Sequence, residues 1–112
     1  MSKRNPFGNI PGLGNMMKQV QKMAEDTQRI DEELAQERIE VSSGGGMVTA
    51  VASGKGQVLE IKIDPQVVDP EDVEMLEDLV VSAVREALEK AVEMKETRMK
   101  ELTGGLDIPG LM

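Results

Sequence analysis

The chain has 112 residues, a length typical of a single domain. It contains no Cys, His, Trp or Tyr, which excludes disulfides, thiol nucleophiles, Ser-His-Asp triads and zinc sites built from His and Cys. Its 21 acidic and 13 basic residues give a formal charge of −8, and this total argues against a polyanion as partner.

The two ends of the chain differ in composition from the middle. Residues 1–14 and 104–112 are rich in Gly and Pro, so we expect a flexible N-terminal arm, a single domain over residues 15–103 and a flexible C-terminal tail. No apolar run approaches the length of a membrane span, and the first residues do not resemble a signal peptide. We therefore expect a soluble cytoplasmic protein with no membrane partner.

A helix is predicted after Asn15, which can cap its start. Apolar residues then recur at the a and d positions of a heptad repeat for about two and a half heptads. These positions are Met16, Val20, Met23, Thr27, Ile30 and Leu34. The pattern fits packing within the chain's own domain or against a second chain, and both alternatives stay open.

The periodicity changes to that of strands near residue 39. Residues 39–43 and 47–52 predict two strands, residues 53–57 a glycine-rich turn, and residues 59–64 a third strand with one dry face. Short strands joined by such turns form an antiparallel meander. The apolar side of the third strand is formed by Leu59, Ile61 and Ile63.

A second helix is predicted from Asp69 as N-cap and Pro70 as the first helical residue to a cap at Gly104. About 34 helical residues would span about 50 Å, more than a small compact core can cover. The fold class is therefore α+β: a long helix, a three-stranded antiparallel meander and a long helix. Because two helices cannot cover every apolar surface of such a sheet, we expect a homodimer with projecting helical arms.

The charge is unevenly distributed. Residues 1–22 carry a charge of +4 and no acid, which leaves −12 for the remainder. Further bases cluster near the end of the second helix, and the predicted topology places both basic segments far from the sheet. The same basic residues also fit ordinary solvated helix ends, where bases at the C-terminus complement the helix dipole. The candidate polyanion-binding residues are Lys3, Arg4, Lys18, Lys22, Lys95, Arg98 and Lys100.

Motifs for catalysis are missing. Gly54-Lys55 is not a phosphate-binding loop, because Gly56 occupies the Ser/Thr position, and Gly44–Gly46 does not extend to GxGxxG. Paired acids such as Glu32-Glu33 lack metal-loop spacing. We therefore expect a binding protein that is not an enzyme, with no metal, cofactor or small-molecule substrate.

The order of several short blocks resembles the YbaB/EbfC family of nucleoid-associated proteins. The blocks are Met16-Met17-Lys18-Gln19, Gly44-Gly45-Gly46-Met47-Val48, Ile61-Lys62-Ile63-Asp64-Pro65, Asp69-Pro70-Glu71-Asp72 and Glu74-Met75-Leu76-Glu77-Asp78-Leu79-Val80. This resemblance implies a bacterial cytoplasmic homodimer, with a central sheet and protruding helical arms, that binds double-stranded DNA in the nucleoid. The seven candidate DNA-binding residues come from charge placement, since no contact motif transfers from the family.

We expect phosphate contacts that are salt-sensitive and weakly sequence-selective, with an influence on nucleoid organisation and gene expression. The alternative is a chaperone-like protein whose helical arms grip protein clients through apolar side chains. A purely structural dimerisation adaptor is a third hypothesis. The client-gripping residues of the alternative are Leu13, Met16, Met17, Leu106 and Ile108.

Overall fold

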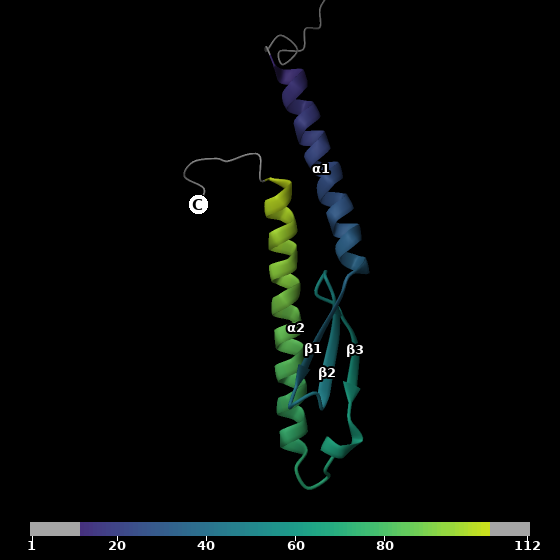
Figure 1. The fold of residues 1–112 in the computed structure, drawn as a ribbon. Coiled ribbons are helices and arrows are strands. Elements are labelled where there is room, and N and C mark those ends of the chain that lie inside the picture. The colour runs from purple at the N-terminus through teal and green to yellow at the C-terminus, as the bar shows by residue number, and fades with distance from the viewer. Residues whose placement is uncertain (1–11, 104–112) are drawn as a thin grey trace, which may run out of the picture.

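The computed structural model describes residues 12–103, and the predicted ends 1–11 and 104–112 lie outside them. The predicted α+β fold is confirmed: a helix, an antiparallel three-stranded sheet and a second helix follow one another (Figure 1). The elements are α1 (Leu13–Gln36), β1 (Arg38–Ser43), β2 (Val48–Ser53), β3 (Val58–Ile63), the short 3-10 helix η1 (Pro65–Val67) and α2 (Val73–Leu102).

The sheet is the meander that the strand pattern predicts. Its strand order is β1-β2-β3, and both pairs are antiparallel. Gly44, Gly45 and Gly46 all have positive φ, which lets the chain reverse tightly between β1 and β2. The pairing of β2 with β3 shifts register between Val51 and Ala52, a bulge that lies just before the β2–β3 turn.

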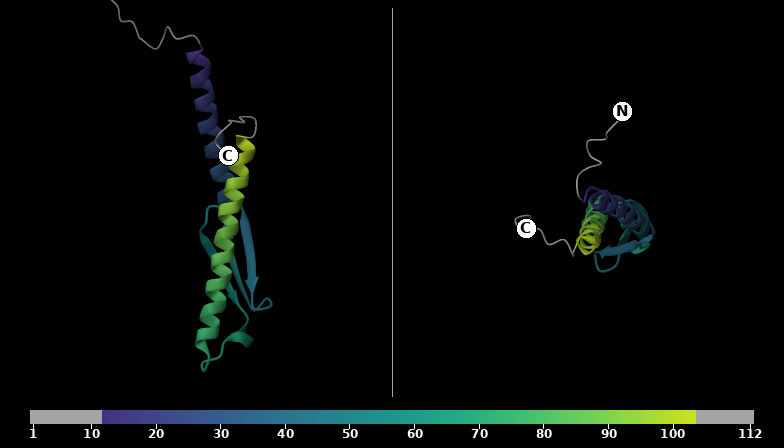
Figure 2. Two further views of the ribbon diagram at one scale, coloured as in Figure 1. Left: turned by 90° about the vertical axis from the view of Figure 1, so that its left-hand side faces the viewer. Right: turned by 90° about the horizontal axis from the view of Figure 1, so that it is seen from above.

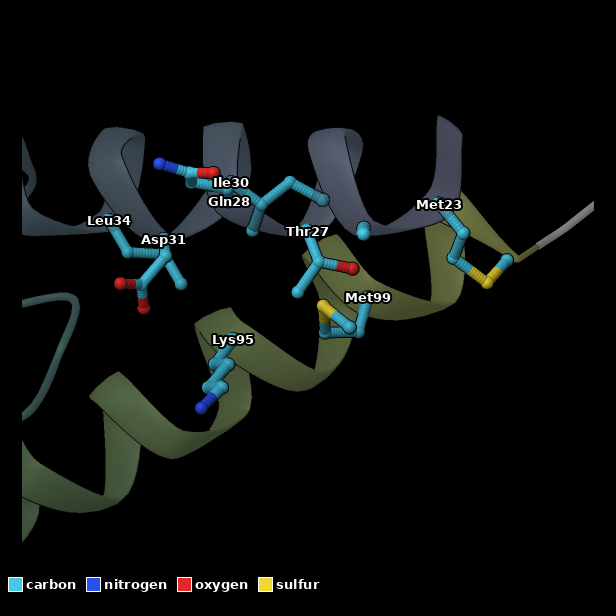
Figure 3. Close-up of a pocket in the computed structure, with 9 residues that line it drawn as sticks. Met23, Thr27, Gln28, Ile30, Asp31, Leu34, Lys95 and Met99 are labelled. Carbon is cyan, nitrogen blue, oxygen red and sulfur yellow. The ribbon is translucent and has the colours of Figure 1, made fainter. Parts of the chain in front are cut away.

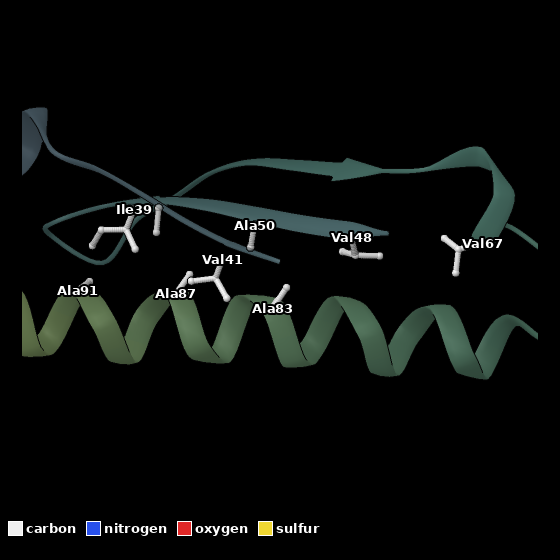
Figure 4. Packing of buried hydrophobic residues seen from close by; sticks show 9 residues of the cluster. Ile39, Val41, Val48, Ala50, Val67, Ala83, Ala87 and Ala91 are labelled. Atoms are coloured by element: carbon white, nitrogen blue, oxygen red, sulfur yellow. The ribbon is translucent and has the colours of Figure 1, made fainter. Parts of the chain in front are cut away.

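The core lies between α2 and one face of the sheet. Ala83, Ala87 and Ala91 recur along one side of α2 and are almost completely buried against apolar side chains of β1 and β2 (Figure 4). A methyl group is short enough to let the helix backbone approach the sheet closely, whereas a longer side chain would hold it away. Alanine at these positions therefore sets the distance between α2 and the sheet. The strand residues of this cluster are Ile39, Val41, Val48, Ala50 and Ala52.

The outer face of the sheet is polar and is not covered by α1. Arg38 on β1 reaches across β2 to Glu60 on β3, with 3.3 Å between the nitrogen and the oxygen. The prediction of a dry face on the third strand is wrong for the single chain, because Leu59 is 48% and Ile63 40% exposed. The physical reason is that α2 lies over β1 and β2 and hardly touches β3.

The helix ends differ from the predicted ones. Helix α1 begins at Leu13 after Gly12, so Asn15 lies inside the first turn and is not the cap. Helix α2 is capped by Asp72, whose carboxylate accepts a hydrogen bond from the Met75 amide, and not by Asp69. Asp69 instead accepts a hydrogen bond from the Glu71 amide within the preceding turn, a competing use of the same carboxylate.

Helix α1 lies beyond the end of the sheet, beside the last turns of α2 (Figures 1 and 2). Of its heptad positions, Ile30 and Leu34 are buried, whereas Met16 is 60% and Val20 70% exposed. Packing within the chain thus accounts for the half of the heptad seam nearest the sheet. Within residues 12–103, neither helix has the length and apolarity needed to cross a lipid bilayer.

We predict that Ala87→Leu lowers the free energy of unfolding by about 1–3 kcal/mol, because the larger side chain overpacks the contact between α2 and the sheet. Urea denaturation followed by circular dichroism measures this change. The matched control is Ala35→Leu on α1, where the alanine is exposed and the change should be within about 0.5 kcal/mol of zero. Equal effects of the two substitutions would contradict the close packing of α2 on the sheet as the cause.

Candidate nucleic-acid interface

Two segments that are far apart in the sequence lie in the same half of the molecule, beyond the sheet. The end of α2 lies beside the middle of α1, and the start of α1 projects past it (Figure 1). The chain runs down α1, forms the three strands in succession and runs back up α2. The start of α1 and the end of α2 therefore point the same way (Figure 2). Both predicted basic segments within the described residues lie there. The topology predicted from the sequence therefore places these segments correctly.

The first half of α1 is basic. Residues 13–24 contain Lys18 and Lys22 and no acid, and both lysines are exposed. The first acid of the helix is Glu25. Lys3 and Arg4, which precede this helix in the sequence, lie outside the described residues.

The end of α2 packs along α1 and leaves a shallow apolar cleft of about 540 Å³ between the two helices (Figure 3). Lys95 and Met99 line it from α2. The side of α1 contributes mainly Met23, Thr27, Ile30, Asp31 and Leu34. The two helices therefore form one packed unit, and this cleft is far too small to admit a DNA duplex.

Arg98 is the one candidate in the described residues that forms an ion pair with an acid. Its Nη2 atom donates to Oε1 of Glu37 at 2.8 Å, and the two side chains are 29% and 38% exposed. This hydrogen bond raises the pKa of Arg98 above its ordinary value against a small desolvation cost, with further attraction from Glu37, Glu33 and Glu101. Arg98 therefore links the end of α2 to the end of α1 nearest the sheet, which we call the base of α1 (residues 31–37). Fewer of its N–H groups are left to bind a phosphate.

Lys95 and Lys100 remain exposed on the last turns of α2. Lys100 lies in the final turn, where its charge also complements the helix dipole. The structure thus brings four exposed lysines to one end of the molecule, two from each helix. These are Lys18, Lys22, Lys95 and Lys100.

The opposite end of the molecule is acidic. Residues 64–78, which connect β3 to α2 and form the first turns of α2, carry seven acids and no base. No group of acids within residues 12–103 is arranged to hold a metal ion. These acids form a solvated negative surface. Glu93, Glu96 and Glu101 also lie among the bases at the end of α2, so the excess of positive charge is confined to the first half of α1.

Comparison with known proteins shows the family of the chain. The sequence profile of the YbaB/EbfC DNA-binding family matches residues 9–106. The chain belongs to this family. Membership of this DNA-binding family confirms the prediction of a binding protein that is not an enzyme.

Other members of the YbaB/EbfC family are similar over nearly the whole chain. A nucleoid-associated protein of Alkaliphilus metalliredigens is 51% identical over 105 residues, covering 94% of this chain and 92% of that protein. One of Acetivibrio thermocellus is 52% identical over 109 residues, covering 93% and 96%. The crystal structure of the uncharacterized protein HP0035 from Helicobacter pylori has a TM-score of 0.70 at 21% identity, covering 78% of this chain and 91% of that one, and shows the same fold.

One group of residues near the interface could not be predicted from the sequence. Gly54 and Lys55 were identified only as turn residues, yet the structure places them against the base of α1, where Lys55 pairs with Asp31 at 3.0 Å. The composition of the turn contains no signal for this contact, because it joins positions that are far apart in the sequence.

We predict that Arg98→Ala lowers the free energy of unfolding only slightly, because about a third of each partner is exposed and solvent screens the pair. Because both side chains remain partly exposed, breaking the pair should change the position of the end of α2 more than the stability of the fold. Urea denaturation of Arg98→Ala and of Arg85→Ala, an exposed arginine of the same helix, gives the comparison. A much larger loss of stability for Arg98→Ala than for Arg85→Ala would contradict this assignment.

Proposed function

We propose that the protein binds double-stranded DNA as a homodimer, through phosphate contacts made by the basic end of its packed helical arms. The observation that carries this proposal is the separation of charge: exposed lysines of α1 and α2 gather at one end, and the acids of residues 64–78 lie at the other. The proposed contacts are Lys3, Arg4, Lys18, Lys22, Lys95 and Lys100, with a smaller part for Arg98.

Phosphate contacts fit the residue types at this end. Lysine ammonium groups are point charges that neutralise phosphates without reading base edges, so binding is weakly sequence-selective and sensitive to salt. A protein that binds many sites along DNA in this way acts on nucleoid organisation and, through it, on gene expression. We place this protein in the cytoplasm at the bacterial nucleoid, because its relatives are named nucleoid-associated proteins.

A second copy of the chain completes the proposed binding unit. Because α1 and α2 of one chain pack together, a duplex is held between the arm pairs of two protomers and not between two helices of one. Unpartnered apolar surfaces support the dimer: a groove along the outer side of α2 and the exposed start of α1. Both outer strands of the sheet are also open edges, which a second copy can protect. The apolar residues of the α2 groove are Val80, Val81, Val84, Leu88 and Val92.

The exposed start of α1 also supports a second candidate function, the gripping of protein clients. Leu13, Met16, Met17 and Val20 lie together on this helix, and flexible methionines suit varied apolar partners. Suppression of aggregation of an unfolded client, without a salt-dependent shift of DNA, would favour this function over DNA binding.

We predict that Lys18→Glu with Lys22→Glu weakens binding to duplex DNA by about tenfold or more at low salt, whatever the sequence of the duplex. The slope of log affinity against log salt should decrease in magnitude by about 0.9 for each phosphate that the variant no longer neutralises. A mobility shift over a salt series measures both. The matched control is Lys62→Glu with Lys90→Glu, which makes the same change of net charge beside the sheet. If the two double variants bind equally well, the basic end is not the contact surface.

We predict that Val81→Asp with Val92→Asp converts the dimer to monomer, since both valines are at least half exposed in the single chain and face the α2 groove. Sedimentation velocity gives the mass. Ser82→Asp, an exposed change in the same helix, should leave the dimer intact. A monomeric wild-type protein would rule out this part of the proposal.

A further inference from the structure

We infer that the β2–β3 turn is a positioning element for DNA binding: Gly54 and Lys55 hold the base of α1 and so set where the basic end of the arm points. This inference rests on the proposed function, because it assigns the turn a role in presenting the lysines of α1 to DNA. Within residues 12–103, no hydrogen bond or ion pair joins the turn to a proposed contact residue. The turn acts through the direction of the helix.

Gly54 packs directly on the last turn of α1. Its amide donates a hydrogen bond to the carbonyl oxygen of Leu34 at 2.9 Å, and the same oxygen accepts from the Glu37 amide at 3.1 Å. A Cβ atom added to Gly54 would lie 2.8 Å from that oxygen and 3.0 Å from Cδ2 of Leu34. Glycine is therefore required here by the close approach of the two backbones, since φ of Gly54 is not in the left-handed region.

Two ion pairs hold the same base from different sides. Lys55 in the turn pairs with Asp31 on α1 at 3.0 Å, and Arg98 on α2 pairs with Glu37 at 2.8 Å. Glu37 is also the only residue between the end of α1 and the start of β1. With so short a connection, a small change of backbone angle at Glu37 tilts the whole helix, and the flanking contacts limit that tilt.

The turn is itself held in shape by Ser53, which is 1% exposed. The Ser53 hydroxyl oxygen accepts from the amides of Lys55 and Gln57 at 3.2 and 3.3 Å, and the Gly56 amide donates to the Ser53 carbonyl at 3.0 Å. A turn closed by several hydrogen bonds of its own is a rigid support. It can therefore transmit the position of the sheet to α1.

The length of α1 turns a small tilt into a large displacement. Lys18 lies about 24 Å from Leu34 along the helix axis, so a tilt of about 10° moves it by about 4 Å. That displacement exceeds the length of a hydrogen bond between an ammonium and a phosphate. The direction of α1 thus decides which phosphates Lys18 and Lys22 can reach.

The experiment measures the distance between the two arms directly. Because the chain has no Cys, Gln19→Cys on α1 and Thr97→Cys on α2 give two unique spin labels at exposed positions. Labelled chains are diluted with unlabelled chains so that double electron–electron resonance reports distances within one chain. Gly54→Ala should shift the mean distance by about 3 Å or more and weaken DNA binding about three- to tenfold, with no basic residue changed.

The matched control is Gly14→Ala, because a Cβ atom there meets nothing within 4 Å and φ is again outside the left-handed region. It should change neither the distance nor DNA binding. If Gly54→Ala does not fold, Lys55→Glu replaces it: repulsion from Asp31 should broaden the distance distribution, and the second change Asp31→Lys should restore it. Lys62→Glu controls for the altered net charge.

The outcomes separate this inference from the proposed function. Wild-type protein that binds DNA, with an unchanged arm distance in Gly54→Ala, overturns the positioning role alone. A shifted distance with unchanged DNA affinity also overturns it. Wild-type protein that binds no DNA overturns the proposed function, and with it the role of the turn. A shifted distance together with weakened binding supports both.

Discussion

The close contact between α2 and the inner face of the sheet is the constraint on which the rest of the molecule depends. The sheet has one apolar face, and the buried alanines at positions 83, 87 and 91 let α2 approach it closely. The contact with the sheet runs along α2 as far as Ala91 and Met94, whereas the helix continues to Leu102. Its last turns continue past the sheet, and these turns give α1 a surface to pack on.

The position of α1 follows from these last turns of α2. Since α1 covers no face of the sheet, its buried residues Ile30 and Leu34 face the end of α2 and the β2–β3 turn. Its first turns, up to Val20, are exposed and have no partner among the described residues of the chain. A helix placed in this way projects its exposed lysines away from the core, which is what a protein that meets a long polyanion requires.

Local patterns made most of the fold predictable, and long-range contacts explain what was missed. Alternating residues located the first and third strands, and the glycine-rich segments on either side bounded the second, each to within a residue or two. The sequence predicts Asp69 as the helix cap because it precedes Pro70. A carboxylate can cap either a turn or a helix, however, and only the fold selects Asp72. The basic segments were predictable from charge and topology. The pairing of Arg98 with Glu37 was not, because no sequence pattern links positions 61 residues apart.

The elongated shape reconciles a charge of −8 with a DNA partner. Along α2, Glu77 and Lys100 are separated by about 35 Å, at about 1.5 Å per residue. At physiological salt the Debye length is about 8 Å, so charges that far apart are screened from one another almost completely. A phosphate near the basic end therefore experiences the lysines and little of the acidic end. The same acids repel a duplex that approaches from the sheet, so the total charge restricts the direction of approach without preventing it.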